Sequence, residues 1–170
     1  RENRYRFALC HGAIQRYGTR PISDNVRAIG AVVEGGFYQG TGLRRRVPSD
    51  KKLLGVSVRK WQNLGSDFET QIANACDYAY EKYGYYTVFL PMQSSRDTAI
   101  MQNIKRKMKH ESAIIKKRYS VEGMLSIIKC FDMCIGMRLH TLIYAAINSV
   151  PLIGLVYDPK INSFMEYTHQ

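Results

Sequence analysis

The stretch from Asp132 to Pro159, DMCIGMRLHTLIYAAINSVPLIGLVYDP, decides the fold. Its apolar start, which ends at Gly136, indicates a buried strand, and a helical pattern opens directly afterwards. The buried face of that helix is formed by Leu139, Leu142, Ile143, Ala146 and Ile147. Arg138 and His140 therefore lie where a strand is followed by a helix. In an open α/β sheet, unpaired N–H groups and the positive end of the helix dipole meet at this edge, so we expect an anionic ligand there.

The same alternation of strands and helices extends to both sides of this stretch. Short apolar runs predict strands at residues 53–58, 85–90, 112–116, 132–135 and 151–156. Helical patterns follow these strands, beginning near residues 66, 97, 120, 137 and 158. Strands that alternate with helices favour right-handed crossovers and a parallel sheet. The predicted fold class is α/β, a Rossmann-like, doubly wound parallel sheet with helices on both faces.

Local signals predict where several helices begin and end. Residues Ser66 to Glu69 have the pattern of a capping box, and Gly84 is placed to end the helix that follows. Ser120 is expected to cap the helix that begins near residue 120. Asp158 is expected to cap the last one, because a proline at the first helical position follows it. A contact between Asp158 and a ligand is the alternative.

The chain of 170 residues, with 45% hydrophobic content, is long enough to bury one core. We divide it into residues 1–50, a poorly legible and irregular segment, and residues 51–170, the Rossmann-like domain. Glycines between Ala28 and Gly42 lack the flanking strand and helix of a dinucleotide-binding loop. There is no initiating Met, which predicts a fragment. Since no signal peptide or membrane-spanning run is visible and the four cysteines form no CxxC pair, we expect a cytoplasmic protein.

The positive charge is concentrated in one segment. The net charge is +11, and Lys105 to Arg118 holds seven basic residues and one acidic residue. A solvated helix end explains this, because cations suit the carboxyl end of a helix. The alternatives are peripheral contact with an anionic membrane surface or lipid phosphate and, less favoured, nucleic acid, which we do not expect as a partner.

Two arginines and a histidine are the candidate functional residues. Arg59 and Arg138 both follow predicted parallel strands, so they share one edge of the sheet. A buried guanidinium needs an anion, which is either a structural carboxylate or a bound phosphate or carboxylate ligand. His140 lies in the first helical turn and suits proton transfer near neutral pH, although a structural role is the alternative.

A resemblance to the polysaccharide pyruvyl transferase family rests on motifs around these residues. They are Ile135 to His140 (IGMRLH) with Tyr157 to Lys160 (YDPK), supported by Gly55 to Trp61 (GVSVRKW), Phe89 to Asp97 (FLPMQSSRD) and Tyr119-Ser120. The similarity is collinear from about Lys51 to Tyr167. Residues 1–50 do not resemble the corresponding family segment, and the chain stops soon after Tyr167, so the domain is expected to be truncated at its carboxyl end.

The resemblance implies transfer of a pyruvyl group from phosphoenolpyruvate to two sugar hydroxyls of a cell-surface polysaccharide or its precursor. The product is a ketal, and phosphate is released. Implied partners are phosphoenolpyruvate as donor and a saccharide acceptor, free or lipid-linked, at the inner face of the membrane; no cofactor and no metal are implied. The fold is expected to be similar to the C-terminal domain of a GT-B glycosyltransferase, and residues 51–170 would bind the donor, without turnover if the other domain is required.

The resemblance also assigns roles to individual residues. Arg59, Arg138 and the backbone of Leu139 would hold the donor, and His140 would act as the acid or base. Gln93 and Asp97 are weaker candidates for contacts with sugar hydroxyls, against a plain loop residue and a helix cap. Trp61 would stack on a sugar face or simply pack.

Two other functions remain open from the sequence. One is a GT-B glycosyltransferase or epimerase domain that uses a nucleotide sugar. The other is a basic, non-catalytic module that binds membrane or nucleic acid through Lys105 to Arg118, with affinity that falls steeply with salt.

Overall fold

The computed structural model describes residues 48, 50–62, 64–116 and 118–168. The strands in this part of the chain are β1 (Lys52–Ser57), β2 (Tyr85–Phe89), β3 (Ser112–Ile114), β4 (Met133–Gly136) and β5 (Leu152–Gly154). The helices are α3 (Phe68–Tyr83), α4 (Ser94–Lys107), α5 (Val121–Lys129), α6 (Leu139–Ile147) and α7 (Pro159–Tyr167). Strands and helices alternate in the predicted order.

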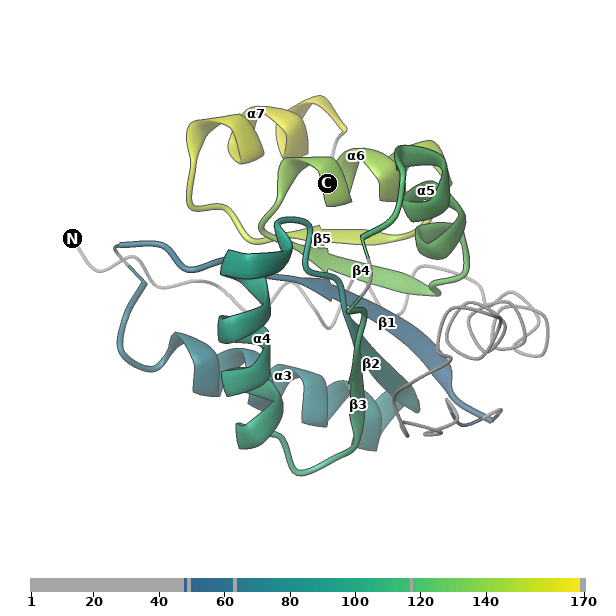
Figure 1. Ribbon diagram of the computed structural model, residues 1–170. Helices are drawn as coiled ribbons and strands as arrows, with labels where there is room; N and C mark the ends of the chain where they lie inside the picture. The colour runs from purple at the N-terminus through teal and green to yellow at the C-terminus, as the bar shows by residue number, and fades with distance from the viewer. Residues whose placement is uncertain (1–47, 49, 63, 117, 169–170) are drawn as a thin grey trace.

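Within the described residues, the strands form one five-stranded sheet with the order β3-β2-β1-β4-β5. All neighbouring strands are parallel. The chain winds outward from β1 in one direction as far as β3, and then returns to place β4 on the other side of β1 (Figure 1). The strand order thus reverses between β1 and β4. In doubly wound sheets, the crevice at the carboxyl ends of two such strands is where ligands bind.

Helices cover both faces of the sheet, which confirms the predicted fold class. In Figure 1, α5, α6 and α7 lie above the sheet, and α3 and α4 lie below it. Each layer has its own apolar cluster. One cluster joins Leu53 and Val88 to Ile127 and Leu142, and the other joins side chains such as Val56 to α3 and α4. Neighbouring residues of the buried strands serve opposite layers because side chains alternate along a strand.

Most of the predicted helix boundaries are confirmed. Gly84 ends α3 in the left-handed conformation, with φ of 72°. The Ser120 hydroxyl accepts a hydrogen bond from the Gly123 amide at 3.2 Å, and Asp158 accepts one from the Lys160 amide at 2.8 Å. Both residues are therefore N-caps, as the sequence predicts.

Two predicted helix starts are wrong. The capping box at Ser66 to Glu69 does not form, because Asp67 is the N-cap of α3 and makes no side-chain hydrogen bond to the helix. Helix α4 begins at Ser94 rather than at Asp97. Asp97 lies inside the first turn, where its carboxylate accepts the backbone amide of the N-cap residue Gln93 at 2.8 Å.

The predictions for residues 1–50 lie outside the described residues, apart from Pro48 and Asp50. No helix in the described part of the chain combines the length and the hydrophobicity needed to cross a bilayer. Cys76 and Cys134 are fully buried free thiols, and burial raises the pKa of Cys76 to about 12. A thiol with such a high pKa is almost entirely protonated and unreactive at neutral pH.

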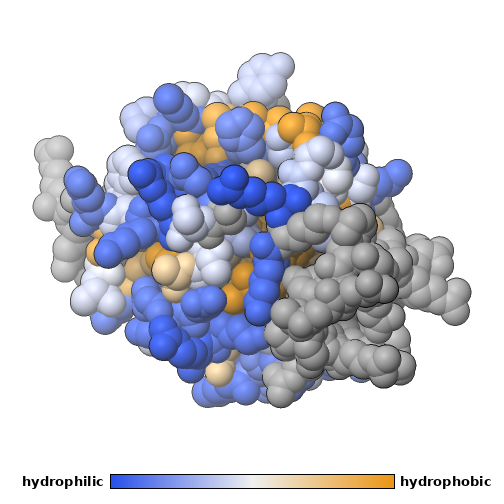
Figure 2. Space-filling view, in the orientation of Figure 1, coloured by the Kyte–Doolittle hydropathy of each residue, from blue (hydrophilic) through white to orange (hydrophobic). Residues whose placement is uncertain are grey.

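Part of the basic segment is used within the fold. Lys107 lies 3.6 Å from Glu69, and Lys105 donates to the backbone carbonyl of Ser112. The backbone amides of Lys109 and His110 donate to Asp77. Figure 2 shows a mostly hydrophilic face over α3 and α4, with hydrophobic surface gathered over α6 and α7. These contacts support the interpretation of the segment as a solvated helix end.

Gly55 tests how tightly the central strand is packed. A Cβ atom at this position would lie 2.8 Å from Cδ2 of Phe131 and 3.0 Å from Sγ of Cys134, and both side chains are almost fully buried. We therefore expect Gly55→Ala to lower the free energy of unfolding by about 1–3 kcal/mol, measured by urea denaturation. The control is Gly65→Ala, where a Cβ would meet no atom within 4 Å. Equal stability of the two variants would contradict this packing.

Candidate functional site

The register of β1 and β4 brings the two candidate arginines to the same edge. Ser57 is the register partner of Gly136. Arg59 and Arg138 each lie two residues beyond this pair, so their backbones leave neighbouring strands side by side. The Met137 amide donates to the Ser57 carbonyl at 2.8 Å, which continues the pairing beyond the end of the sheet. Both residues lie at the reversal of the strand order, where the fold favours a ligand site.

Arg138 is held by the residues that begin α4. Its Nε lies 3.1 Å from one oxygen of Asp97, and its Nη2 donates to the other oxygen and to Oε1 of Gln93 at 3.0 Å. Asp97 is completely buried, and the Arg138 side chain is 16% exposed. The Gln93 amide also donates to Asp97, at 2.8 Å. This bidentate pair fixes the orientation of the guanidinium and leaves its Nη1 without a protein partner among the described residues.

Arg59 has a different environment, because no carboxylate among the described residues pairs with it. Its guanidinium carbon lies 5.0 Å from the centre of the Trp61 ring and 5.9 Å from that of Tyr157. Its Nη1 makes a long contact of 3.4 Å with the Tyr157 hydroxyl. Its Nε is buried and has no hydrogen-bond partner in the described structure. Aromatic faces stabilise a guanidinium but do not neutralise its charge, so this cation is available to an anion.

Leu139 and His140 form the start of α6. The helix has Arg138 as its N-cap and no side-chain cap bond. The first amides of a helix have no acceptor within it, so the backbone N–H groups of Leu139 and His140 have no partner inside α6 and can bind an anion. The His140 side chain is exposed, and its ring lies 6.2 Å from that of Tyr144. The imidazole is therefore accessible for proton transfer.

Two buried hydroxyls near this edge escaped the sequence analysis. The side-chain oxygens of Ser57 and Thr141 are buried, and the described residues offer them no hydrogen-bond partner. Ser57 ends β1, and Thr141 lies in the first turn of α6. The only sequence signal for these two residues is their position, since Ser57 lies inside the GVSVRKW segment and Thr141 directly follows GMRLH. Tyr157 was likewise noted only as part of the YDPK motif.

Trp61 packs against Tyr157, with the two ring centres 4.9 Å apart in an edge-to-face arrangement. This contact accounts for the position of Trp61 without a sugar. Gln93 is exposed, and its side-chain amide nitrogen has no partner among the described residues. This nitrogen can therefore still reach a ligand. Within the same residues, no group of three or more His, Cys, Asp or Glu side chains is placed to hold a metal ion.

The Asp97–Arg138 pair makes a clear prediction for stability. Asp97→Ala leaves Arg138 largely buried without its counter-charge, so we expect the free energy of unfolding to fall by about 3 kcal/mol in urea denaturation. The double variant Asp97→Leu/Arg138→Met should recover most of this loss, because it removes both charges. The control is Glu81→Ala, which breaks an exposed contact with His110 and should cost less than about 1 kcal/mol. An equal effect of Asp97→Ala and Glu81→Ala would contradict a buried pair.

A solved glycosyl transferase structure is similar to this chain in fold. No curated protein sequence matches the chain. The crystal structure of the glycosyl transferase family 9 from Veillonella parvula DSM 2008 is similar, with a TM-score of 0.50 and 17% sequence identity. The match covers 79% of this chain and 36% of that chain, so this chain spans about a third of its length. At this identity the likeness concerns the fold alone, and it agrees with the predicted similarity to a GT-B domain.

A model of the polysaccharide pyruvyl transferase family matches residues 36–159. The match begins at residue 36, so the prediction that residues 1–50 do not resemble the family is wrong for residues 36–50. It ends at Pro159, the first residue of α7. It includes both arginines, Gln93, Asp97, Leu139 and His140. Because it covers well over half of the chain, we conclude that the chain belongs to the polysaccharide pyruvyl transferase family.

Proposed function

We infer that this domain binds phosphoenolpyruvate and transfers its pyruvyl group to two hydroxyls of a saccharide acceptor. The acceptor is part of a cell-surface polysaccharide or its precursor. The observation that carries this proposal is the Arg59 guanidinium, which lies at the reversal of the strand order with a buried, unpartnered Nε and no carboxylate beside it in the described structure. Phosphoenolpyruvate brings a phosphate and a carboxylate, and the planar fork of arginine binds either group.

The two arginines contribute to the binding of phosphoenolpyruvate in different ways. Arg59 supplies a charge that no carboxylate among the described residues balances, and the ligand anion would act as its counter-ion. Arg138 supplies a guanidinium whose orientation is set by Asp97, with Nη1 left for the ligand. The backbone amides of Leu139 and His140, which have no acceptor within α6, add donors at the positive end of this helix.

The reaction requires one proton at carbon and one with the leaving phosphate. Two C–O bonds form between the sugar oxygens and C2 of phosphoenolpyruvate, and the bond from C2 to the phosphate oxygen breaks. One hydroxyl proton ends on the methylene carbon, which becomes a methyl group, and the other leaves with phosphate. The exposed His140 is the residue suited to carry a proton between these atoms. Donors at Arg59 and at α6 stabilise the charge on the departing phosphate.

Gln93 and Asp97 have unequal parts in this proposal. Asp97 is fully buried and both its oxygens accept hydrogen bonds, so it acts by positioning Arg138. Gln93 is exposed, and its side-chain amide nitrogen, which has no partner among the described residues, is placed to donate to an acceptor hydroxyl.

Donor binding is tested by calorimetric titration of the chain with phosphoenolpyruvate at moderate salt. We expect Arg59→Ala to weaken binding by roughly 10- to 100-fold, because hydrogen bonds to charged groups contribute about 1.5–3 kcal/mol. Lys129→Ala is the matched control, since it removes one exposed positive charge from the end of α5. Equal binding by Arg59→Ala and Lys129→Ala would contradict the proposed site. Binding of uridine diphosphate in place of phosphoenolpyruvate would decide for nucleotide-sugar chemistry.

His140 is expected to affect chemistry and not donor affinity. His140→Gln should bind phosphoenolpyruvate within about twofold of the unaltered chain, because the Leu139 and His140 amides remain. Phosphate release in the presence of methyl galactoside or methyl glucoside should fall by about 100-fold or more, the usual contribution of a general acid or base. Unchanged phosphate release by this variant would exclude His140 as the proton carrier.

A further inference from the structure

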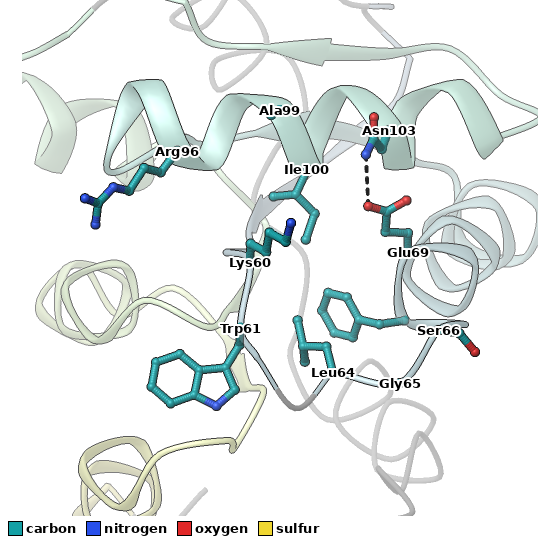
Figure 3. Close-up of a pocket in the computed structure, with 11 residues that line it drawn as sticks. Lys60, Trp61, Leu64, Gly65, Ser66, Glu69, Arg96, Ala99, Ile100 and Asn103 are labelled. Carbon is teal, nitrogen blue, oxygen red and sulfur yellow. Dashed lines mark hydrogen bonds between the residues drawn. The ribbon is translucent and has the colours of Figure 1, made fainter.

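A second pocket lies beside the arginine site, between the connection from β1 to α3 and the helix α4. Its volume is about 270 Å³ (Figure 3). It is lined on one side by Lys60, Trp61, Leu64, Gly65, Ser66, Phe68 and Glu69, and on the other by Arg96, Ala99, Ile100 and Asn103. None of the residues that the family resemblance places in the donor site lines this pocket.

The segment Arg59-Lys60-Trp61 separates the pocket from the donor site. Arg59 and Trp61 both turn toward Tyr157. Lys60 lies between them and points the opposite way. Figure 3 shows its ammonium group beside Ile100, inside the pocket, and the Trp61 ring directed away from it. The cation of the donor site and the cation of this pocket therefore belong to consecutive residues.

The pocket carries positive charge that the described protein does not neutralise. Lys60 and Arg96 have no acidic partner among the described residues, and the Arg96 guanidinium extends outward at the rim in Figure 3. The one carboxylate in the lining, Glu69, is already engaged by Asn103 at 3.0 Å and by Lys107 at 3.6 Å. The unpaired charges therefore favour an anionic ligand.

The rest of the lining suits a sugar ring. Leu64, Phe68 and Ile100 form an apolar surface, and Phe68 and Ile100 are almost fully buried. Ser66 and Asn103 place polar groups beside it. A sugar ring presents C–H faces and hydroxyls together, which matches such a mixed lining. The volume lies just below the roughly 300 Å³ at which pockets for drug-sized ligands begin, so it holds one ring and not a nucleotide.

We propose that this pocket binds a pyranose ring that carries one anionic substituent, a carboxylate or a phosphate, with Lys60 as the residue that binds the anion. That the ligand is part of the acceptor saccharide rests on the proposed function. The pocket then holds the charged sugar one residue away from the donor arginine. The chemistry of the ligand itself follows from the lining.

The test is calorimetric titration of the full chain with glucuronate and with glucose 1-phosphate, which distinguish the two sources of the anion. We expect Lys60→Gln to weaken at least one of them by about 10-fold or more, and Arg59→Ala to leave that binding unchanged. Ala99→Phe, a substitution at an exposed position of the lining, should block the same ligand by filling the pocket. Lys129→Gln is the matched control for net charge.

Three results would overturn the pocket assignment. They are equal binding by Lys60→Gln and the unaltered chain, loss of binding in Arg59→Ala in place of Lys60→Gln, and binding of inorganic phosphate as tight as that of glucose 1-phosphate. Phosphoenolpyruvate is titrated into the same variants. If it binds while neither charged sugar does, the pocket is wrong and the proposed function stands. If a charged sugar binds and phosphoenolpyruvate does not, the pocket stands and the proposed function fails.

The single tryptophan of the chain gives an independent readout, because Trp61 directly follows Lys60 and borders the pocket, while its ring contacts Arg59. We expect its fluorescence to change with the charged sugar in the unaltered chain and in Arg59→Ala, and not in Ala99→Phe. A persistent sugar-induced change in Ala99→Phe would place the sugar elsewhere.

Discussion

The buried carboxylate of Asp97 is the constraint on which the functional edge of this domain depends. A charge that is wholly removed from water must be compensated by a close counter-charge and hydrogen bonds. The compensation comes from Arg138 and from the Gln93 amide. Asp97 belongs to α4, below the sheet, and Arg138 immediately precedes α6, above it (Figure 1). The pair therefore ties the two helical layers together at the carboxyl edge of the sheet.

The ion pair between Asp97 and Arg138 also makes the two arginines differ in charge compensation. Arg138 is oriented by the fold and its charge is already balanced, so it can shape a site at little cost to stability. Arg59 lies against Trp61 and Tyr157 and has no balancing carboxylate in the described structure. A site that contains both residues has one guanidinium of fixed orientation, that of Arg138, and one whose charge is not balanced by a described carboxylate, that of Arg59. Such an arrangement suits an anionic ligand, since the charge of Arg59 is neutralised only when the ligand binds.

The segment from Arg59 to Trp61 connects this site to the neighbouring pocket. Alternate residues of an extended segment point to opposite sides, which is why Arg59 and Trp61 serve one side and Lys60 the other. The proposed donor and the proposed charged sugar would lie on opposite sides of this short segment.

The sequence by itself determined the order of strands and helices, the parallel sheet with helices on both faces, and the shared edge of Arg59 and Arg138. These follow from hydrophobic periodicity, from local caps such as Ser120 and Asp158, and from the handedness of crossovers, all of which act over short stretches of chain. The family also followed from short motifs around Gly136 and Tyr157.

Only the tertiary structure decided which partner each charge has. Asp97 and Arg138 are 41 residues apart, and Arg59 and Tyr157 are 98 residues apart, so no local pattern links them. The Asp97 carboxylate serves both ranges, because it accepts the Gln93 amide at the start of α4 and also binds Arg138. The pocket at Lys60 exists because α4 packs beside the connection from β1 to α3. Compensation of buried charge depends on distances in space, and these are set by the packing of whole layers.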